Sequence, residues 1–553
     1  MACTTPNGAP SSKEKKYDRQ LRLWGANGQN KLEAAHIALF GASATGCEIL
    51  KNLVLPSVGK FTIIDDKIVT EADLGTNFFL DEESVGKSRA ERTAALLEEL
   101  NPDVKGAFMN DSLSNLLSSK PELFKPSTSP FTHIIVVSPF STPDILQLSP
   151  EIPTFLVHSL GWSIVLRIMA PTRCIVETHP DSLADLRLFN PWEELTALAV
   201  EKTKGLDKRA SEGGMDNYEH GHVPYVLLLL KYLDDWKAEH NGQYPSNYKE
   251  KNEFKAMLLD KMRTDVPGGS EENYEEAAAA IMKNLKQADI SSDAKEVLED
   301  PRCINPTADL ENFWIITNAV RQFRDSPAQG AGLLPLSGGF PDMKAESKSY
   351  VELQNMYRTR AQRDAALVLE NAQATLSKLG RDPESITLEE VSLFTKHSNF
   401  IRRINYRPLT CEYSLPCDDH HRRTVIDALN NWDTEESLIH DYIAIRAFQE
   451  YYSTIGRFPG AEDKGLKKDQ EMLEAFAGDY LKTLDYIGGL ADRTKNLVQE
   501  VVRAGGSELH VIASFAGGMV AQEIVKVITQ QYIPVNNTVI FDGIQSKTAV
   551  FEF

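Results

Sequence analysis

The two ends of this chain carry the alternating strand and helix pattern of an α/β domain, and a long helical stretch separates them. Short apolar runs at residues 36–40, 60–64, 132–137 and 153–158 predict strands, and amphipathic stretches between them predict helices. This alternation is typical of a parallel sheet that helices cover on both faces, with right-handed crossovers. The N-terminal part is therefore predicted to be a Rossmann-like, doubly wound α/β fold.

The last part of the chain returns to the same pattern. Residues 514–528 have the apolar spacing of a helix, and residues 537–541 and 549–553 are predicted strands. The pair Asp542-Gly543 between them favours a turn, so we expect the two strands to form a hairpin or to lie as neighbours. The end of the chain is then expected to complete the sheet that the N-terminal part begins.

The middle of the chain has few strand signals and is dominated by helical spacing. The predicted helices are at residues 222–240, 273–286, 310–323, 344–379, 388–396 and 435–451. No fixed period repeats, which disfavours a solenoid. We divide the chain into the N-terminal part of an α/β domain (1–170), a mostly helical insertion in two lobes (171–488) and a C-terminal part that completes the α/β domain (489–553).

Composition and charge limit the kinds of partner. The chain has 59 basic and 79 acidic side chains, a formal net charge of −20, so nucleic acid is an unfavourable partner. Six cysteines form no CxxC pair, which gives no sign of a zinc site and fits a reducing compartment, the cytosol or the nucleus. The longest purely aliphatic run, residues 226–230, is too short to cross a membrane.

Residues 40–46 lie where a nucleotide-binding loop belongs, between the first strand and its helix. Such a loop uses one glycine for the tight turn, a second for phosphate approach and a third for helix packing. Gly41 and Gly46 supply the first and third, whereas Ser43 stands at the second, and Asp65 ends the next strand where a ribose-binding acid belongs. From these residues alone, a nucleotide site and a purely structural turn are both open.

Four further segments resemble the adenylating half-domains of the ubiquitin-activating superfamily. They are residues 17–25 (Tyr-Asp-Arg-Gln-Leu-Arg-Leu-Trp-Gly), 77–79 with 86–90, 508–510, and 515–518 with 521–523. Segments at 177–181, 186–188 and 335–360 extend the resemblance over nearly the full length, to the non-catalytic subunits of the neddylation branch. The resemblance implies an adenylation-type domain, with the helical insertion equivalent to the catalytic-cysteine region.

The same resemblance implies the partners. The chain would form a heterodimer with a catalytic subunit, which binds ATP and magnesium, adenylates a Nedd/Rub-type ubiquitin-like protein and takes it up as a thioester. A conjugating enzyme would follow indirectly, with cullins as the downstream targets. No cofactor would be bound by this chain, and neither nucleic acid nor a membrane would be a partner.

Compared with active members of the superfamily, the nucleotide pocket is predicted to be degenerate. Residues 75–79 contain no arginine in the crossover that normally touches phosphate, and Arg89 stands where a lysine is usual. Ser138 follows the strand that normally ends in a metal-binding aspartate, so no metal site is expected. The vestigial nucleotide residues would be Gly41, Ser43, Gly46 and Asp65.

Arg19 is the predicted catalytic contribution of this chain. The resemblance implies that the arginine of the 17–25 block reaches across the dimer to the partner's ATP, as an arginine finger does. The pattern alone favours a surface residue of an amphipathic helix with Arg22, and only the resemblance favours the finger; the alternative stays open.

Two other sets of residues are candidates. Cys411 and Cys417 lie in the insertion but lack the surroundings of a thioester nucleophile, since Cys417 precedes two aspartates. The glycine- and proline-punctuated loop that follows residue 330 is expected to dock a partner, with a packed surface loop as the alternative. Its predicted contact residues are Leu333, Leu334, Pro335, Leu336, Phe340 and Pro341.

Three other functions compete with a regulatory subunit. A stand-alone adenylating enzyme of the same superfamily would carry out ATP–pyrophosphate exchange without a partner. A pure adaptor would bind partners through the helical insertion and make no use of Arg19. An NAD-dependent oxidoreductase is disfavoured, because no hydride-transfer residues accompany Gly41 and Gly46.

Overall fold

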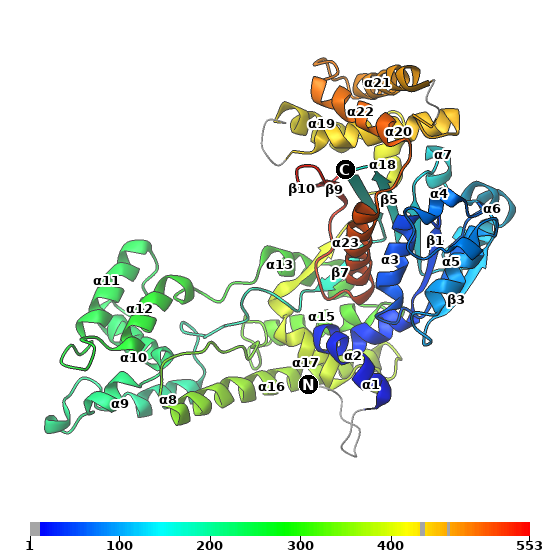
Figure 1. The fold of residues 1–553 in the computed structure, drawn as a ribbon. Coiled ribbons are helices and arrows are strands. Elements are labelled where there is room, and N and C mark those ends of the chain that lie inside the picture. Colours follow the sequence, from blue (N-terminus) through cyan, green and yellow to red (C-terminus); the bar gives the residue numbers. More distant parts are fainter. Residues whose placement is uncertain (1–10, 432–436, 462–464) are drawn as a thin grey trace. The chain divides into compact units, whose positions relative to one another are not determined.

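The computed structural model describes residues 11–431, 437–461 and 465–553, and the chain divides into two compact units. The first comprises Met1–Ile175 with Arg403–Phe553, and the second comprises Val176–Arg402. The two chain ends therefore build one α/β unit, as predicted (Figure 1). The predicted insertion boundary at 488 does not coincide with a unit boundary, because residues from 403 onward pack with the sheet.

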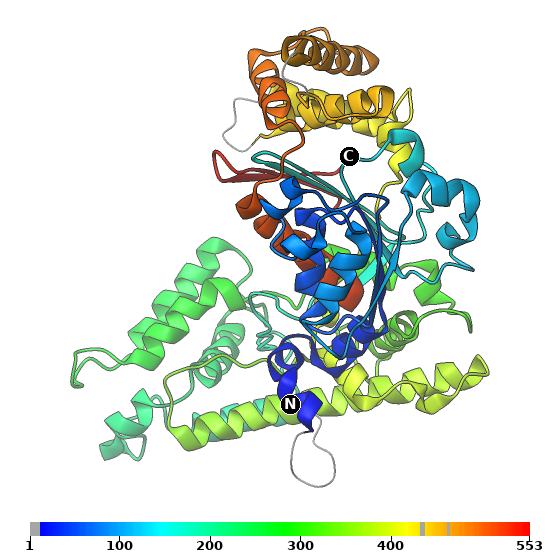
Figure 2. The ribbon, with the colours of Figure 1, turned by 45° about the vertical axis from the view of Figure 1, so that its right-hand side comes forward.

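One eight-stranded sheet forms the centre of the α/β unit, in the order β10-β9-β6-β5-β4-β1-β2-β3. The strands are β1 (His36–Phe40), β2 (Lys60–Ile64), β3 (Lys105–Met109), β4 (His133–Val137), β5 (Thr154–Leu160), β6 (Ser163–Met169), β9 (Thr538–Asp542) and β10 (Lys547–Phe551). The first five strands run parallel, and β6, β9 and β10 extend the sheet antiparallel. In Figure 2 the red hairpin of β9 and β10 lies at one edge.

The sheet is mixed: five parallel strands form the predicted doubly wound part, and three antiparallel strands extend it. Only Gly161 and Trp162 separate β5 from β6, and so short a connection permits only antiparallel pairing. The predicted hairpin near the C-terminus is confirmed, because β9 pairs with β6 and β10 in antiparallel register. A separate two-stranded sheet joins β7 (Arg173–Val176) to β8 (Ile401–Ile404).

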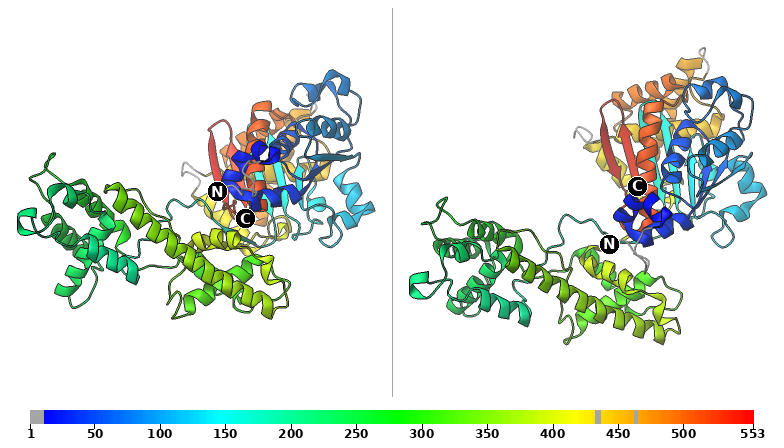
Figure 3. Two further views of the ribbon diagram at one scale, coloured as in Figure 1. Left: turned by 90° about the horizontal axis from the view of Figure 1, so that it is seen from below. Right: turned by 60° about the horizontal axis from the view of Figure 1, so that its bottom comes forward.

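Helices cover both faces of the large sheet. They include α1 (Ser12–Lys16), α2 (Asp18–Ala34), α3 (Ala44–Val54), α4 (Glu71–Leu74), α5 (Arg89–Glu98), α6 (Leu113–Ser119), α7 (Thr142–Ile145) and α23 (His510–Thr529). Helix α23 lies along α3 and across strands β5 and β6 (Figure 3, right). By length and composition α23 alone among the described helices could cross a membrane, and its packing against α3 and the sheet explains that apolar composition.

A second helical layer belongs to the same unit. It consists of α18 (Leu409–Tyr413), α19 (Asp419–Asn430), α20 (Ile439–Ile455), α21 (Leu466–Thr483) and α22 (Asp492–Ala504). The buried Arg167 of β6 forms an ion pair of 2.7 Å with Glu412 of α18, and Glu412 also accepts from the Tyr442 hydroxyl at 2.7 Å. These buried contacts tie α18 and α20 to the sheet.

The second unit is built from helices. They are α8 (Glu193–Lys202), α9 (Asn217–Gly221), α10 (Tyr225–Glu239), α11 (Tyr248–Asp260), α12 (Glu272–Asn284), α13 (Ser292–Leu298), α14 (Pro301–Ile304), α15 (Asn312–Asp325), α16 (Ser347–Lys378) and α17 (Leu388–Lys396). Helix α10 is buried on nearly every side, which agrees with its run of leucines. The predicted helices of this region are present, with small shifts at their ends.

Candidate functional site

The loop between β1 and α3 has the shape that its glycines predict. Gly41 adopts φ +93°, and a Cβ there would approach the Val137 carbonyl at 3.2 Å. A Cβ on Gly46 would lie 2.4 Å from the Gly41 carbonyl oxygen, so only glycine allows this close packing of helix on strand. The sequence therefore predicted this strand–turn–helix correctly.

A carboxylate of the chain itself occupies the N-terminus of α3. The Ser43 hydroxyl donates to Glu508 Oε1 at 2.9 Å, and the Thr45 amide donates to Oε2 at 3.3 Å. A helix N-terminus after a glycine-rich turn is the position where such folds bind phosphate. Burial raises the pKa of Glu508, and the two donors partly offset that effect. Glu508 thus fills the anion position with an internal ligand.

Asp65 holds the loop together instead of facing an open ribose position. Its Oδ2 accepts from the Ala42 amide at 2.6 Å and from Arg89 Nη2 at 2.6 Å, while Oδ1 accepts from the Lys67 amide. Arg89 also contacts Asp73 at 3.2 Å, and only 11 % of its side chain is exposed. The cation at the position that normally faces phosphate is therefore neutralised by two carboxylates of the same chain.

The crossover after β2 turns its one amide side chain inward. Asn77 is buried, and its amide nitrogen donates to Cys47 Sγ at 3.2 Å, whereas the next residue, Phe78, is 79 % exposed. His510 Nδ1 lies 3.0 Å from the Thr76 carbonyl oxygen and fixes the same segment. The crossover thus offers no polar side chain at Asn77 for a nucleotide.

A cavity of about 500 Å³ lies at the ends of the parallel strands, between this loop and the second helical layer. Its ionisable lining consists of Asp65, Asp66, Asp73, Asp111, Asp144 and Glu508 against Lys67 and Arg89. Ser138, which directly follows β4, also lines the cavity. This surplus of carboxylates is unfavourable for the negative charge of a triphosphate.

Comparison with known proteins now identifies the family. Residues 17–137 match the ThiF family. The NEDD8-activating enzyme E1 regulatory subunit of Xenopus laevis is 39 % identical over 98 % of this chain and 98 % of its own length. The Arabidopsis thaliana protein of that name, AXR1, is 34 % identical over 97 % of this chain and 96 % of its own. This chain belongs to the family of NEDD8-activating enzyme E1 regulatory subunits.

A crystal structure of PaaA resembles a smaller part. It covers 30 % of this chain and 55 % of its own length at 16 % identity, with a TM-score of 0.25. The curated relatives, in contrast, extend over both compact units. The membership of the regulatory-subunit family therefore rests on these full-length relatives.

Within this regulatory-subunit fold, Arg19 lies exposed on α2. Tyr17, just before it, is buried, and its hydroxyl donates to Asp103 at 2.7 Å, which fixes the start of the helix. Arg22, one turn later, is paired with Asp18 at 2.9 Å. Among the described residues Arg19 has no hydrogen-bond or ion-pair partner. Its guanidinium is thus available to a group outside this chain.

The loop predicted to dock a partner is largely part of the core of the helical unit. Leu334, Pro335 and Leu336 are buried, and the Leu336 amide donates to Asp364 Oδ2 at 2.9 Å. These three side chains pack against their own unit, and Leu334 and Leu336 also line a small pocket of that unit. Leu333, Phe340 and Pro341 are half-buried, and docking through them stays a prediction.

Neither candidate cysteine has the surroundings of a thioester nucleophile. Burial raises the pKa of Cys411 and of Cys417, and the charge of Asp418 raises both further. A nucleophilic thiol needs the opposite shift. The interpretation of both cysteines as structural is consistent with this geometry.

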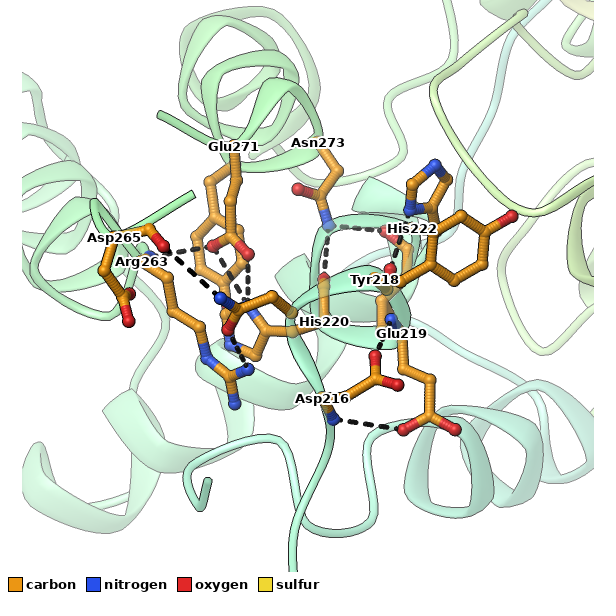
Figure 4. A network of polar contacts seen from close by, with 12 residues as sticks. Asp216, Tyr218, Glu219, His220, His222, Arg263, Asp265, Glu271 and Asn273 are labelled. Carbon is orange, nitrogen blue, oxygen red and sulfur yellow. Dashed lines mark hydrogen bonds and ion pairs between the residues drawn. The ribbon is translucent and has the colours of Figure 1, made fainter. Parts of the chain in front are cut away.

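The helical unit of this family member contains a second polar cluster, around α9 (Figure 4). The buried His220 lies with Nδ1 2.8 Å from Glu271 and Nε2 3.1 Å from the Tyr274 hydroxyl. Asn273 donates to the carbonyl oxygens of His220 and Val223 at 2.9 and 3.1 Å. These contacts close the loops around α9 and α12, and the cluster is a structural anchor.

Proposed function

We propose that this chain is the non-catalytic subunit of a heterodimeric activating enzyme for a Nedd/Rub-type ubiquitin-like protein. The observation that carries the proposal is the contrast between two positive groups. Arg89, inside the cavity, is neutralised by Asp65 and Asp73, whereas Arg19, on the surface, is unpaired among the residues the structure describes. This contrast supports a cavity that does no nucleotide chemistry of its own and an Arg19 guanidinium that acts on a neighbouring subunit.

In this proposal the reaction takes place in the catalytic subunit. That subunit binds ATP and magnesium, and the C-terminal carboxylate of the modifier attacks the α-phosphate and releases pyrophosphate. Arg19 would neutralise charge that develops on the partner's phosphates, for which a rigid, permanently charged guanidinium is well suited. The modifier would then form a thioester with the catalytic subunit and pass to a conjugating enzyme.

The remaining expectations belong to the same proposal. This chain binds neither nucleotide nor metal itself, and it works in the cytosol or the nucleus. Its net charge of −20 supports a function without nucleic acid, and no membrane partner is proposed.

The test is the substitution Arg19→Ala in the heterodimer. We expect modifier-dependent ATP–pyrophosphate exchange to fall on the order of 10²- to 10³-fold, the usual effect of removing one positioned donor from a charged transition state. Arg22→Ala is the matched control. It removes the same positive charge one helical turn after Arg19, but Arg22 is already paired with Asp18.

The heterodimer must be shown to form equally well with both variants, by size-exclusion chromatography. If the Arg19→Ala and Arg22→Ala heterodimers have the same exchange rate, Arg19 does not act as an arginine finger. That result would favour the pure adaptor as the better description of this chain.

A further inference from the structure

The cavity at the ends of the parallel strands has a built-in preference for one sign of charge. Glu508 occupies the N-terminus of α3, the position in this fold that would attract an anion. Asp65 and Asp73 neutralise Arg89. The α3 N-terminus and Arg89, which would both favour phosphate, thus already bind carboxylates of the same chain. A cavity of about 500 Å³ lies beside them.

Two carboxylates on the cavity wall are left without compensation. Asp66 lies just beyond the end of β2, and Asp144 lies on α7. Within the described ranges neither side chain has a hydrogen-bond or ion-pair partner. Lys67 is the other basic group of the wall, and its single positive charge does not balance Asp66, Asp111 and Asp144, so the wall keeps a net negative charge.

The two carboxylates act on a common neighbour. Tyr452 of α20 lines the same cavity, and its pKa is raised first by burial and then by the charges of Asp66 and Asp144. Phe458 adds a second aromatic ring to this wall. Carboxylates beside aromatic faces are the surroundings that organic cations prefer in proteins.

A buried hydroxyl supplies an independent sign of a ligand. Ser159, at the end of β5, is only 2 % exposed and lines the cavity. Its Oγ has no hydrogen-bond partner in the described part of the chain. Buried polar groups are almost always paired, so an unpaired hydroxyl on a cavity wall indicates that a polar ligand completes it. A hydroxyl oxygen can accept a hydrogen bond from an N–H group, and a ligand with a positively charged N–H group also suits the negative charge of the wall.

We propose that this cavity is a binding site for an organic cation that carries an alkylammonium or guanidinium group. Asp66 and Asp144 supply the charge, Tyr452 and Phe458 the aromatic wall, and Ser159 an acceptor. Free polyamines and the side chains of lysine and arginine share this chemistry. The adenylation-type pocket has thereby changed from an anion site to a cation site.

Calorimetric titration of the full chain with two probes, spermidine and N-acetyl-arginine amide, tests the proposal. We expect saturable binding of one molecule per chain that weakens as salt is raised. The double substitution Asp66→Asn with Asp144→Asn should weaken binding at least tenfold. Glu91→Gln with Glu122→Gln is the control, because both carboxylates are exposed and lie outside the cavity.

The two probes distinguish the sources of the cation. Tighter binding of spermidine indicates a free polyamine, and tighter binding of the arginine amide indicates a side chain of a protein. Ser159→Ala keeps the charge of the wall and should weaken binding without changing the circular dichroism spectrum. No saturable binding of either probe, or equal affinity in the Asp66/Asp144 variant and the control, would overturn the proposal.

Discussion

A hydroxyl at residue 43 and a carboxylate at residue 508 together change the chemistry of the α3 N-terminus. Glycine at 43 would leave room for phosphate and would offer no side-chain donor. Ser43 instead holds Glu508 at 2.9 Å, and the same carboxylate reaches the Thr45 amide. The loop keeps its fold because Gly41 and Gly46 are retained, while its ligand is now a part of the chain.

Asp469 of α21 gives a prediction at the scale of one carboxylate. It accepts from Arg457, from the Tyr451 hydroxyl and from the Gly460 amide, each at 2.7–2.8 Å. The hydrogen bonds from Arg457 lower its pKa from 3.8 to about 2, although burial acts in the opposite direction. Because the folded pKa is depressed, the stabilisation is complete above about pH 4 and is lost as the pH falls toward 2.

We therefore expect Asp469→Asn to lower the free energy of unfolding by about 1–2 kcal/mol at pH 7, with a smaller deficit at pH 3. Urea denaturation at both pH values measures the difference. Asp479→Asn in the same helix is the control, because that carboxylate is exposed and, among the residues the structure describes, pairs with Lys482 alone. A deficit that does not shrink at pH 3 would contradict the linkage.

The site residues differ in how far the sequence could predict them. Gly41, Ser43 and Gly46 follow one another in the chain, so a local pattern defines their geometry. The contact of Ser43 with Glu508 joins residues 465 positions apart, and no local pattern predicts it. The same limit applies to Arg89. The sequence shows an arginine at this position, but its pairing with Asp65 and Asp73 depends on the folded chain.

At the scale of elements, the close contact of α23 with α3 joins the two ends of the chain. Gly517 faces α3, and a Cβ there would lie 2.7 Å from the Glu48 Cβ and 2.8 Å from its carbonyl carbon. Gly518, the next residue, has no atom within 4 Å of its would-be Cβ. Two adjacent glycines in one helix thus have opposite surroundings.

Alanine substitutions at these glycines should have opposite effects. We expect Gly517→Ala to lower the free energy of unfolding by about 1–3 kcal/mol, because the backbone of α3 must move. Gly518→Ala should raise it by about 0.5–1 kcal/mol, because alanine favours the helix. Thermal and urea denaturation of the two variants measures both changes. Equal effects at the two positions would contradict the predicted packing.

The elements themselves were predictable where their patterns are strong. Apolar runs located β1, β2, β4 and β5, whose side chains are buried. Strand β3 was missed because it lies at the sheet edge with mostly exposed or half-exposed side chains, and β7 and β8 because each is only four residues long. Strand β6 was missed as well, although nearly all its side chains are buried.

At the scale of the whole molecule, the two chain ends form one adenylation-type unit, and a helical unit is inserted between Ile175 and Arg403. The resemblance at both ends predicted this closure. The predicted insertion, 171–488, extends beyond the second compact unit, because helices α18 to α22 belong to the same compact unit as the sheet. Secondary-structure type therefore does not define a unit, whereas packing does.

The central claim is that this chain supports adenylation without carrying it out. Modifier-dependent ATP–pyrophosphate exchange should be measured with this chain alone, with a candidate catalytic subunit alone and with both together. We expect no exchange above background for this chain alone and a large gain when both are present. Exchange by the isolated chain, or no gain on adding it to the catalytic subunit, would contradict the claim.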